Sequence, residues 1–168
     1  MSKFVSVEGR VIAQAISDTS TTALVPLGTR IKAIDNASTS YGEGEFIYLL
    51  GVASAVVGSV ALIDQDDFSS SLAVANDVGY LAVAMSINVA AQYGWYQVKG
   101  KAVIKGLTGL ADNASLFLTA TAGSLDDAVV AGDRVKGYAK TASALDTPST
   151  GLAEADICDP FVDNGEAA

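Results

Sequence analysis

Short apolar runs separated by turn-forming residues dominate the chain from Phe46 onward. The runs are rich in Val, Ile, Leu and aromatic residues, and clusters of Gly, Asn, Asp and Ser bound them, as is typical of short strands joined by turns. This pattern predicts strands at Phe46–Leu50, Ser59–Ile63, Leu81–Ser86, Gly94–Ile104, Ser115–Thr119 and Arg134–Thr141. No long segment has helical spacing, although Ser70–Asn76 and Thr147–Ala155 are each compatible with a short helical turn. We therefore expect a mainly β fold, a small antiparallel β-barrel or sandwich.

Apolar and polar residues alternate most clearly from Trp95 to Lys105. Because successive side chains of a strand point to opposite faces, this alternation predicts one buried face and one solvated face. The buried face would consist of Tyr96, Val98, Ala102 and Ile104. The solvated face would consist of Trp95, Gln97, Lys99, Lys101 and Lys105. A second strand repeats the pattern, with Val135, Ala139 and Thr141 set against Lys136, Tyr138 and Lys140.

The first forty residues have a different texture, and we interpret them as an extended N-terminal arm. Asp18–Thr22 is polar and has no period, Pro26 interrupts the run that follows, and Asp35–Tyr41 is typical of a loop. Apolar residues nevertheless recur throughout, at Val11, Ile12, Ile16, Leu24, Val25, Leu27, Ile31 and Ile34. Because such residues are stabilised by burial, we expect the arm to pack on its own domain or on a neighbouring molecule.

We divide the chain into an arm at residues 1–40, a β domain at residues 41–163 and an acidic end at residues 164–168. The residues from Asp146 onward carry six acidic and no basic side chains. We interpret them as a solvated acidic tail with a short terminal strand near Ile157–Val162. At 168 residues the chain has the length of one domain, or of one domain with an arm.

Composition and charge disfavour most enzyme chemistry. The chain contains no histidine, which removes Ser-His-Asp and Cys-His nucleophiles, HExxH zinc sites and histidine acid–base catalysis. Its one cysteine, Cys158, excludes an intrachain disulfide and a multi-cysteine metal site. With 19 acidic and 10 basic residues the net charge is −9, which argues against nucleic acid as a partner. We expect no enzyme activity and no cofactor.

Two uncharged stretches, Phe46–Ile63 and Val78–Val98, approach the length of a membrane span. Glycines and serines interrupt the first stretch, and the second contains three side-chain amides, which are costly in hydrocarbon. No Lys or Arg lies between Lys32 and Lys99, so the basic flanks that orient spans are missing. We therefore expect no membrane partner, and the N-terminal sequence lacks the apolar core of a signal peptide.

The tightest acidic cluster, Asp64, Asp66 and Asp67, invites comparison with a calcium-binding loop. An EF-hand loop has a glycine at its sixth position and alternating ligands, whereas this segment has Ser69 at the sixth position and Phe68 where a ligand belongs. Aspartate also favours turns, because its carboxylate accepts hydrogen bonds from nearby backbone amides. We interpret the cluster as a turn between strands and expect no metal site.

Two groups of residues are candidates for a protein interface. Tyr93, Trp95 and Tyr96 form the densest aromatic group, and such residues either anchor interfaces or fill cores. The alternation places Trp95 outside and Tyr96 inside. Lys99 and Lys101 belong to a basic face, which with its neighbours is Lys99, Lys101, Lys105, Arg134, Lys136 and Lys140. That face is either an ordinary solvated surface or the contact for an acidic partner, such as the tail of another copy. The candidate interface residues are Tyr93, Trp95, Tyr96, Lys99 and Lys101.

Seven short segments of glycines, turn residues and small β-formers carry a resemblance to a known family. They are Leu27–Asp35, Tyr41–Tyr48, Gly79–Met85, Tyr93–Gly100, Leu118–Asp127, Ala131–Asp133 and Asp159–Val162. In this order and spacing, over most of the chain, they resemble the head-decoration, or capsid cement, proteins of tailed bacteriophages. The polar segment Asp18–Thr22 departs from that pattern.

The resemblance implies a virion structural protein without catalytic residues. Proteins of this family are small β domains that bind the outside of an expanded phage head, commonly as trimers, and brace neighbouring coat subunits. The implied partners are the major capsid protein and further copies of this chain. The implied location is the outer surface of the capsid after synthesis in the host cytoplasm, with residues 1–40 reaching across a subunit boundary.

The residues alone leave a second function open, a carbohydrate-binding or other adhesion β domain of a fibre or surface protein. In that case Trp95 would be the platform for a sugar ring, with carboxylates nearby. A groove lined by Trp95, Tyr93 and two acidic residues would favour this alternative.

Overall fold

The computed structural model describes residues 4–7 and 13–165, and within them the chain forms strands and turns. In chain order the strands are β1 (Phe4–Ser6), β2 (Thr19–Ser20), β3 (Arg30–Asp35), β4 (Glu43–Leu50), β5 (Val60–Ile63), β6 (Ser70–Leu72), β7 (Gly79–Ala84), β8 (Tyr93–Lys105), β9 (Phe117–Leu118), β10 (Leu125–Asp126), β11 (Lys136–Thr141) and β12 (Leu152–Val162). The mainly β fold predicted from the sequence is confirmed. Across the described ranges, no helix is long and apolar enough to cross a membrane.

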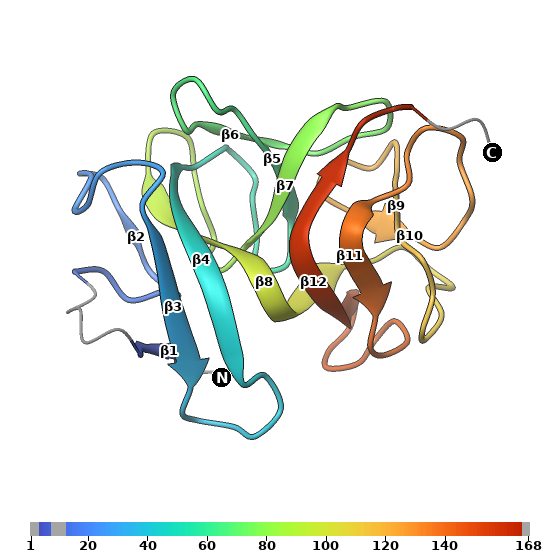
Figure 1. Ribbon diagram of the computed structural model, residues 1–168, viewed down its shortest axis with the longest axis horizontal. Coiled ribbons are helices and arrows are strands. Elements are labelled where there is room, and N and C mark those ends of the chain that lie inside the picture. The colour runs from blue at the N-terminus through green and yellow to red at the C-terminus, as the bar shows by residue number, and fades with distance from the viewer. Residues whose placement is uncertain (1–3, 8–12, 166–168) are drawn as a thin grey trace.

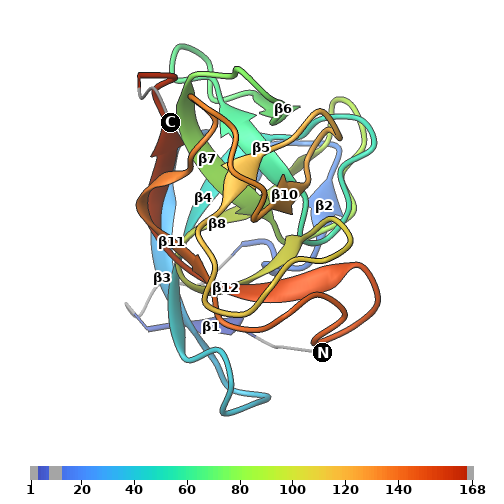
Figure 2. The same ribbon diagram turned by 90° about the vertical axis from the view of Figure 1, so that its right-hand side faces the viewer.

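Ten strands form one antiparallel sheet that curls round on itself (Figures 1 and 2). The order along the sheet is β1-β3-β4-β8-β12-β7-β5-β6, with β2 paired to β8 and β11 paired to β12. The long strand β8 pairs with four others, β4, β12, β7 and β2. A backbone hydrogen bond of 2.8 Å from the Lys105 N–H to the Gly58 carbonyl joins the end of β8 to the chain entering β5, which tightens the curl. β9 and β10 form a separate small sheet.

Each of the six predicted strands overlaps a strand of the structure, namely β4, β5, β7, β8, β9 and β11. The terminal strand is longer than predicted, because β12 begins at Leu152 and pairs with β8 over Leu152–Cys158. The pattern does not predict β1, β2, β3, β6 or β10. Most of these are two or three residues long, too short for a period-2 pattern to stand out.

The two segments proposed for short helical turns are not helical. The first, Ser70–Asn76, begins with β6, which pairs with β5, and its Ser70 hydroxyl donates to the Leu50 carbonyl at 2.8 Å. The second, Thr147–Ala155, contains a turn at Gly151, whose φ of +76° is incompatible with a right-handed helix, and then enters β12. In both places pairing with a neighbouring strand overrides a weak local preference.

Residues 1–40, interpreted as an arm, supply β1, β2 and β3 to the sheet. β3 pairs with β4 over Arg30–Ile34, and Ile31 and Ala33 are buried. The division between residues 40 and 41 therefore falls inside the hairpin that joins β3 to β4. Ile16 is 3% exposed and packs on the chain's own sheet. Val11, Ile12 and most of the acidic end at residues 164–168 lie outside the described residues.

Three clusters of buried side chains form the core. The largest lies between the main sheet and the β9–β10 sheet, and includes Leu81, Val83, Ile104, Leu116, Leu118 and Leu125. A second cluster contains Ile47, Leu49 and Tyr96, and a third contains Ile16, Tyr48 and Trp95. Because Trp95 and Tyr96 are adjacent on β8, the second and third clusters occupy opposite faces of the sheet.

The prediction for β8 is right for the apolar residues, which are buried, and wrong for two of the residues expected to be solvated. Tyr96, Val98, Ala102 and Ile104 are all buried, as predicted, but they divide between two clusters. The division occurs because the pairing with β4 slips by one residue, with Glu45 opposite Lys99 and Phe46 opposite Gln97. Such a bulge reverses which face the following residues point to. The prediction that Trp95 and Gln97 are solvated is wrong, since each is 1% exposed.

Candidate interaction surfaces

The predicted aromatic group lies in the interior of the protein. Trp95 and Tyr96 are 1% and 0% exposed, whereas Tyr93 is partly buried. Trp95 packs against Tyr48 with ring centroids 4.9 Å apart, and Tyr93 stacks on Tyr48 at 6.3 Å. An outward-facing Trp95 was expected from the alternation, and the structure corrects this. A sugar platform at Trp95, which needs an open indole face, is corrected with it.

Gln14 explains why Trp95 is covered. The Trp95 indole N–H donates to the Gln14 carbonyl at 3.0 Å, and the Tyr48 hydroxyl donates to Gln14 Oε1 at 2.6 Å. Gln14 Nε2 in turn donates to the carbonyls of Tyr93 at 3.0 Å and Asp18 at 2.7 Å. We call this arrangement of Gln14, Tyr48, Tyr93 and Trp95 the aromatic clasp. It fastens the segment before β2 onto the sheet, and one glutamine in an otherwise featureless stretch gives no sequence signal for it.

Tyr96 belongs to a second buried polar group, on the opposite face. Its hydroxyl accepts a hydrogen bond from Asn88 Nδ2 at 3.2 Å and lies 3.2 Å from the Ser70 hydroxyl. Burial raises the pKa of Tyr96, and it also raises the pKa of Tyr48 in the aromatic clasp. Both phenols therefore remain neutral at physiological pH and act as hydrogen-bonding groups inside the core.

The predicted lysines lie on an open part of the same strand. Lys99 and Lys101 line a trough of about 250 Å³, which we call the charged trough, on the face of the sheet that carries Tyr96. The trough is formed by β3, β4, β8 and β12, and its charged residues are Lys32, Glu43, Glu45, Lys99, Lys101 and Asp156. Its lining includes Gly44 and Gly100, near the point where β8 changes partner from β4 to β12.

β12 separates the two strands expected to form one basic face. Lys101 on β8 pairs with Asp156 on β12, and Asp156 pairs with Lys140 on β11. Acidic residues therefore stand between the two sets of lysines, so positive charge does not accumulate across the sheet. This arrangement favours the solvated interpretation over a basic contact face for an acidic tail.

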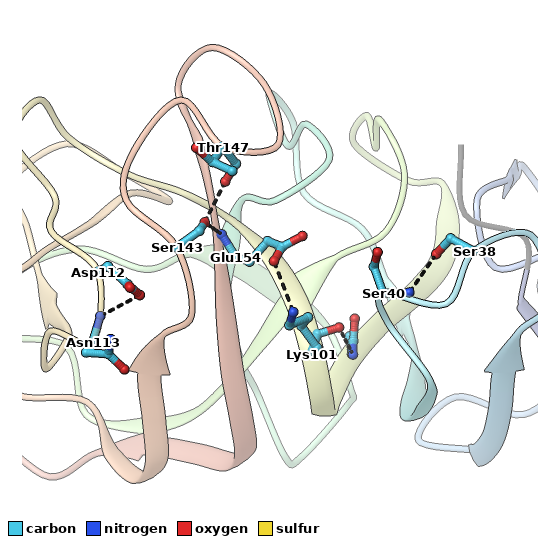
Figure 3. A network of polar contacts seen from close by, with 9 residues as sticks. Ser38, Ser40, Lys101, Asp112, Asn113, Ser143, Thr147 and Glu154 are labelled. Atoms are coloured by element: carbon cyan, nitrogen blue, oxygen red, sulfur yellow. Dashed lines mark hydrogen bonds and ion pairs between the residues drawn. The ribbon is translucent and has the colours of Figure 1, made fainter.

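Ion pairs join the strands that line the charged trough. Lys101 Nζ lies 3.1 Å from Glu154 Oε2, as Figure 3 shows, and the Glu154 backbone N–H donates to the Ser143 hydroxyl. Arg30 Nη1 on β3 contacts Glu45 at 3.3 Å and Asp159 at 2.8 Å. Burial and the neighbouring Glu154 carboxylate raise the pKa of Tyr41, in the β3–β4 hairpin, to about 12. These contacts tie the β3–β4 hairpin to β12.

The acidic cluster has the turn geometry predicted for it. Asp64 Oδ1 accepts from the Asp66 N–H at 2.9 Å, and Asp67 Oδ1 accepts from the Ser69 N–H at 2.8 Å. Hydrogen bonds from Ser69 lower the pKa of Asp67. Among residues 4–7 and 13–165, no group of three or more acidic or cysteine side chains is arranged to hold a metal ion.

Of the candidate interface residues, the structure places Tyr93 and Trp95 in one cluster, Tyr96 in the cluster on the opposite face of the sheet, and Lys99 and Lys101 at the charged trough. Comparisons with family models, with curated proteins and with solved structures find no match to this chain.

Proposed function

We propose that this chain is a virion structural protein, a decoration or cement protein that binds the outer surface of a phage head. In this role it assembles as a homotrimer and stabilises contacts between neighbouring major capsid subunits. The chemistry required is that of a stable body with contact surfaces, because bracing a shell involves neither bond cleavage nor a cofactor. Because many copies bind one symmetric lattice, individually weak contacts add up to strong retention on the shell.

The observation that carries the proposal is the position of the resembling segments in the fold. Most of them coincide with strands and a turn of the fold, namely β3, β4, β7, the first part of β8, the β9–β10 turn and the end of β12, whereas Ala131–Asp133 lies in the loop before β11. The resemblance therefore follows mainly the strand framework. The aromatic clasp supports the same role, since it holds the N-terminal segment rigidly against that framework.

Survival of the shell is the direct test. Expanded shells of the coat protein from the same phage would be heated or osmotically shocked with and without this protein, and intact particles counted by electron microscopy. We expect bound protein to raise the survival temperature of the shells. Binding with unchanged survival would contradict the cement role but not decoration, and absence of binding would contradict both.

The trimer is tested separately by light scattering after gel filtration. A native mass near three times 17.1 kDa is expected. A monomer that stays monomeric on the shell would contradict the trimer and leave shell binding to be judged on its own.

A further inference from the structure

Three segments of this charged protein contain no Asp, Glu, Lys or Arg, and they meet at one end of the sheet. The segments are residues 19–29, 46–63 and 78–98. β2 pairs with the start of β8, through Thr19 opposite Gly94 and Ser20 opposite Tyr93, and lies beside it in Figure 1. The Gly51 N–H donates to the Gln92 carbonyl at 2.6 Å, which joins the chain after β4 to the loop before β8. We call the surface formed by residues 19–24, 50–52 and 86–94 the uncharged pole.

In the loop between β7 and β8, apolar side chains are exposed and a polar side chain is buried, which is the reverse of the usual arrangement in water. Ile87 and Val89 are 67% and 47% exposed, while Asn88 between them is completely buried. The Asn88 amide donates to the hydroxyls of Tyr96 at 3.2 Å and Ser86 at 3.4 Å. Its oxygen has no partner among the described residues. Leu24, 48% exposed, adds a third apolar side chain to this pole.

Two glycines make room for this inverted loop. A Cβ added to Gly51 would come within 2.5 Å of Asn88 Oδ1, and one added to Gly94 would come within 2.7 Å of Asn88 Nδ2. The fold therefore provides a fitted slot for the Asn88 amide. The opposite arrangement would bury Ile87 and Val89, each with a gain of about 1.5–3 kcal/mol, and leave the amide in water. The slot and the Asn88 hydrogen bonds hold the loop in this arrangement, which leaves Ile87 and Val89 exposed for contact with another molecule.

An acidic turn lies on one side of this apolar centre. The Leu50 N–H donates to the Phe68 carbonyl at 3.0 Å, so the turn with exposed Asp64, Asp66 and Asp67 lies next to the chain at Gly51. No basic residue occurs between Lys32 and Lys99, a range that includes that turn, the β7–β8 loop and the chain after β4. A partner that matches this surface has an apolar centre and basic residues around it.

We propose that the uncharged pole is the surface that docks on the coat protein of the shell, with Ile87 and Val89 seated in an apolar depression bordered by basic residues. This inference rests on the proposed function and adds the contact surface to it. A second copy is a poorer occupant, because a chain with a net charge of −9 is a poor source of the basic residues that would match the acidic turn. An anionic membrane is disfavoured by the same charges.

The test is cosedimentation with expanded, undecorated shells of the coat protein from the same phage. The pole variant is Ile87→Ser with Val89→Ser, and the matched control is Val129→Ser with Val130→Ser, whose side chains are 72% and 44% exposed elsewhere on the protein. We expect the pole variant to bind the shells about tenfold more weakly or worse, and the control to bind within about twofold of wild type. Asp66→Lys should weaken binding at low salt and lose that effect at high salt.

Each other outcome overturns the inference in a distinguishable way. If wild type binds and the pole variant binds equally well, the docking surface is wrong and the proposed function stands. If wild type does not bind, the proposed function fails and the inference fails with it. A pole variant that changes the native mass by light scattering would assign the surface to a second copy. Binding to vesicles of phosphatidylcholine and phosphatidylglycerol that the pole variant loses would assign it to lipid.

Unchanged thermal melting of both double variants would show that the fold is intact.

Discussion

The two halves of β8 have the same alternating sequence but different surroundings. From Gly94 to Val98 every residue is buried, because the clasped N-terminal segment covers one face and the cluster around Tyr96 fills the other. From Lys101 to Lys105 the burial alternates, since the core covers one face, and Lys99 and Lys101 line the charged trough. A period-2 pattern therefore identifies a strand, but what covers each of its faces is decided by segments distant in sequence.

The largest loss of stability is expected from Trp95→Ala, in the half of β8 that is covered on both faces. The substitution removes the indole that packs on Tyr48 and that donates to the Gln14 carbonyl, and leaves a cavity. We expect the free energy of unfolding to fall by about 4 kcal/mol, measured by urea denaturation. Lys99→Ala, in the half with an open face, should change it by less than about 0.5 kcal/mol. Similar losses for both variants would contradict the contrast between the halves.

The sequence allowed the fold class and the six principal strands to be predicted because alternation and turn residues are local signals. It also placed Ala102 and Ile104 in the core correctly, since only one face of β8 is covered there. Trp95 was misplaced because the residue that covers it, Gln14, is 81 positions away and has no distinctive context. Nothing in a local pattern reports that contact.

The candidate surfaces show the same limit. Lys99 and Lys101 were correctly placed on an exposed face, but the acidic strand β12 between them and β11 could not be foreseen without the strand order. The inverted loop at Ile87–Val89 could not be predicted, because a local pattern assigns apolar residues to the buried side and this loop buries the polar residue instead. The slot between Gly51 and Gly94 that decides it is formed by the chain just after β4 and by β8.

The next effect concerns the point where β8 changes partner. Gly100 has a φ of +99°, and a Cβ there would lie 2.6 Å from the Glu43 carbonyl oxygen. Gly109 has nearly the same φ, +98°, with nothing within 4 Å. Gly109→Ala should cost about 1 kcal/mol through backbone strain alone, and Gly100→Ala about 3 kcal/mol through strain and steric conflict with β4. Equal losses in urea denaturation would mean that β4 moves aside freely at the charged trough.

A smaller loss of stability is expected when the N-terminal segment that covers the first half of β8 is loosened while β8 itself is unchanged. Gln14→Ala leaves the Tyr48 hydroxyl without its acceptor and removes the donors to Tyr93 and Asp18. We expect a loss of about 2 kcal/mol, together with faster hydrogen exchange at the β2 amides and the Trp95 indole N–H. Gln65→Ala, at an exposed turn, is the matched control and should change neither measurement. Unchanged exchange in Gln14→Ala would show that Ile16 alone holds the segment.

The smallest effect is the pH dependence of stability that Tyr41 contributes near the open half of β8. Its pKa of about 12 in the folded protein, raised by burial and by Glu154, exceeds the ordinary value of 10.0. The folded state therefore binds more protons than the unfolded state between these values, and the stability contributed by neutral Tyr41 is lost as pH rises from about 10 to about 12. Burial also raises the pKa of Tyr48 and Tyr96, so tyrosinate absorbance at 295 nm should show several late-ionising groups, and the group that Tyr41→Phe removes is Tyr41. Glu154→Gln, which removes the nearby charge, should move that ionisation to lower pH. If the late absorbance is the same in Tyr41→Phe as in the wild type, Tyr41 ionises near its ordinary pKa, and Arg30 and Asp159 hold the hairpin to β12 without it.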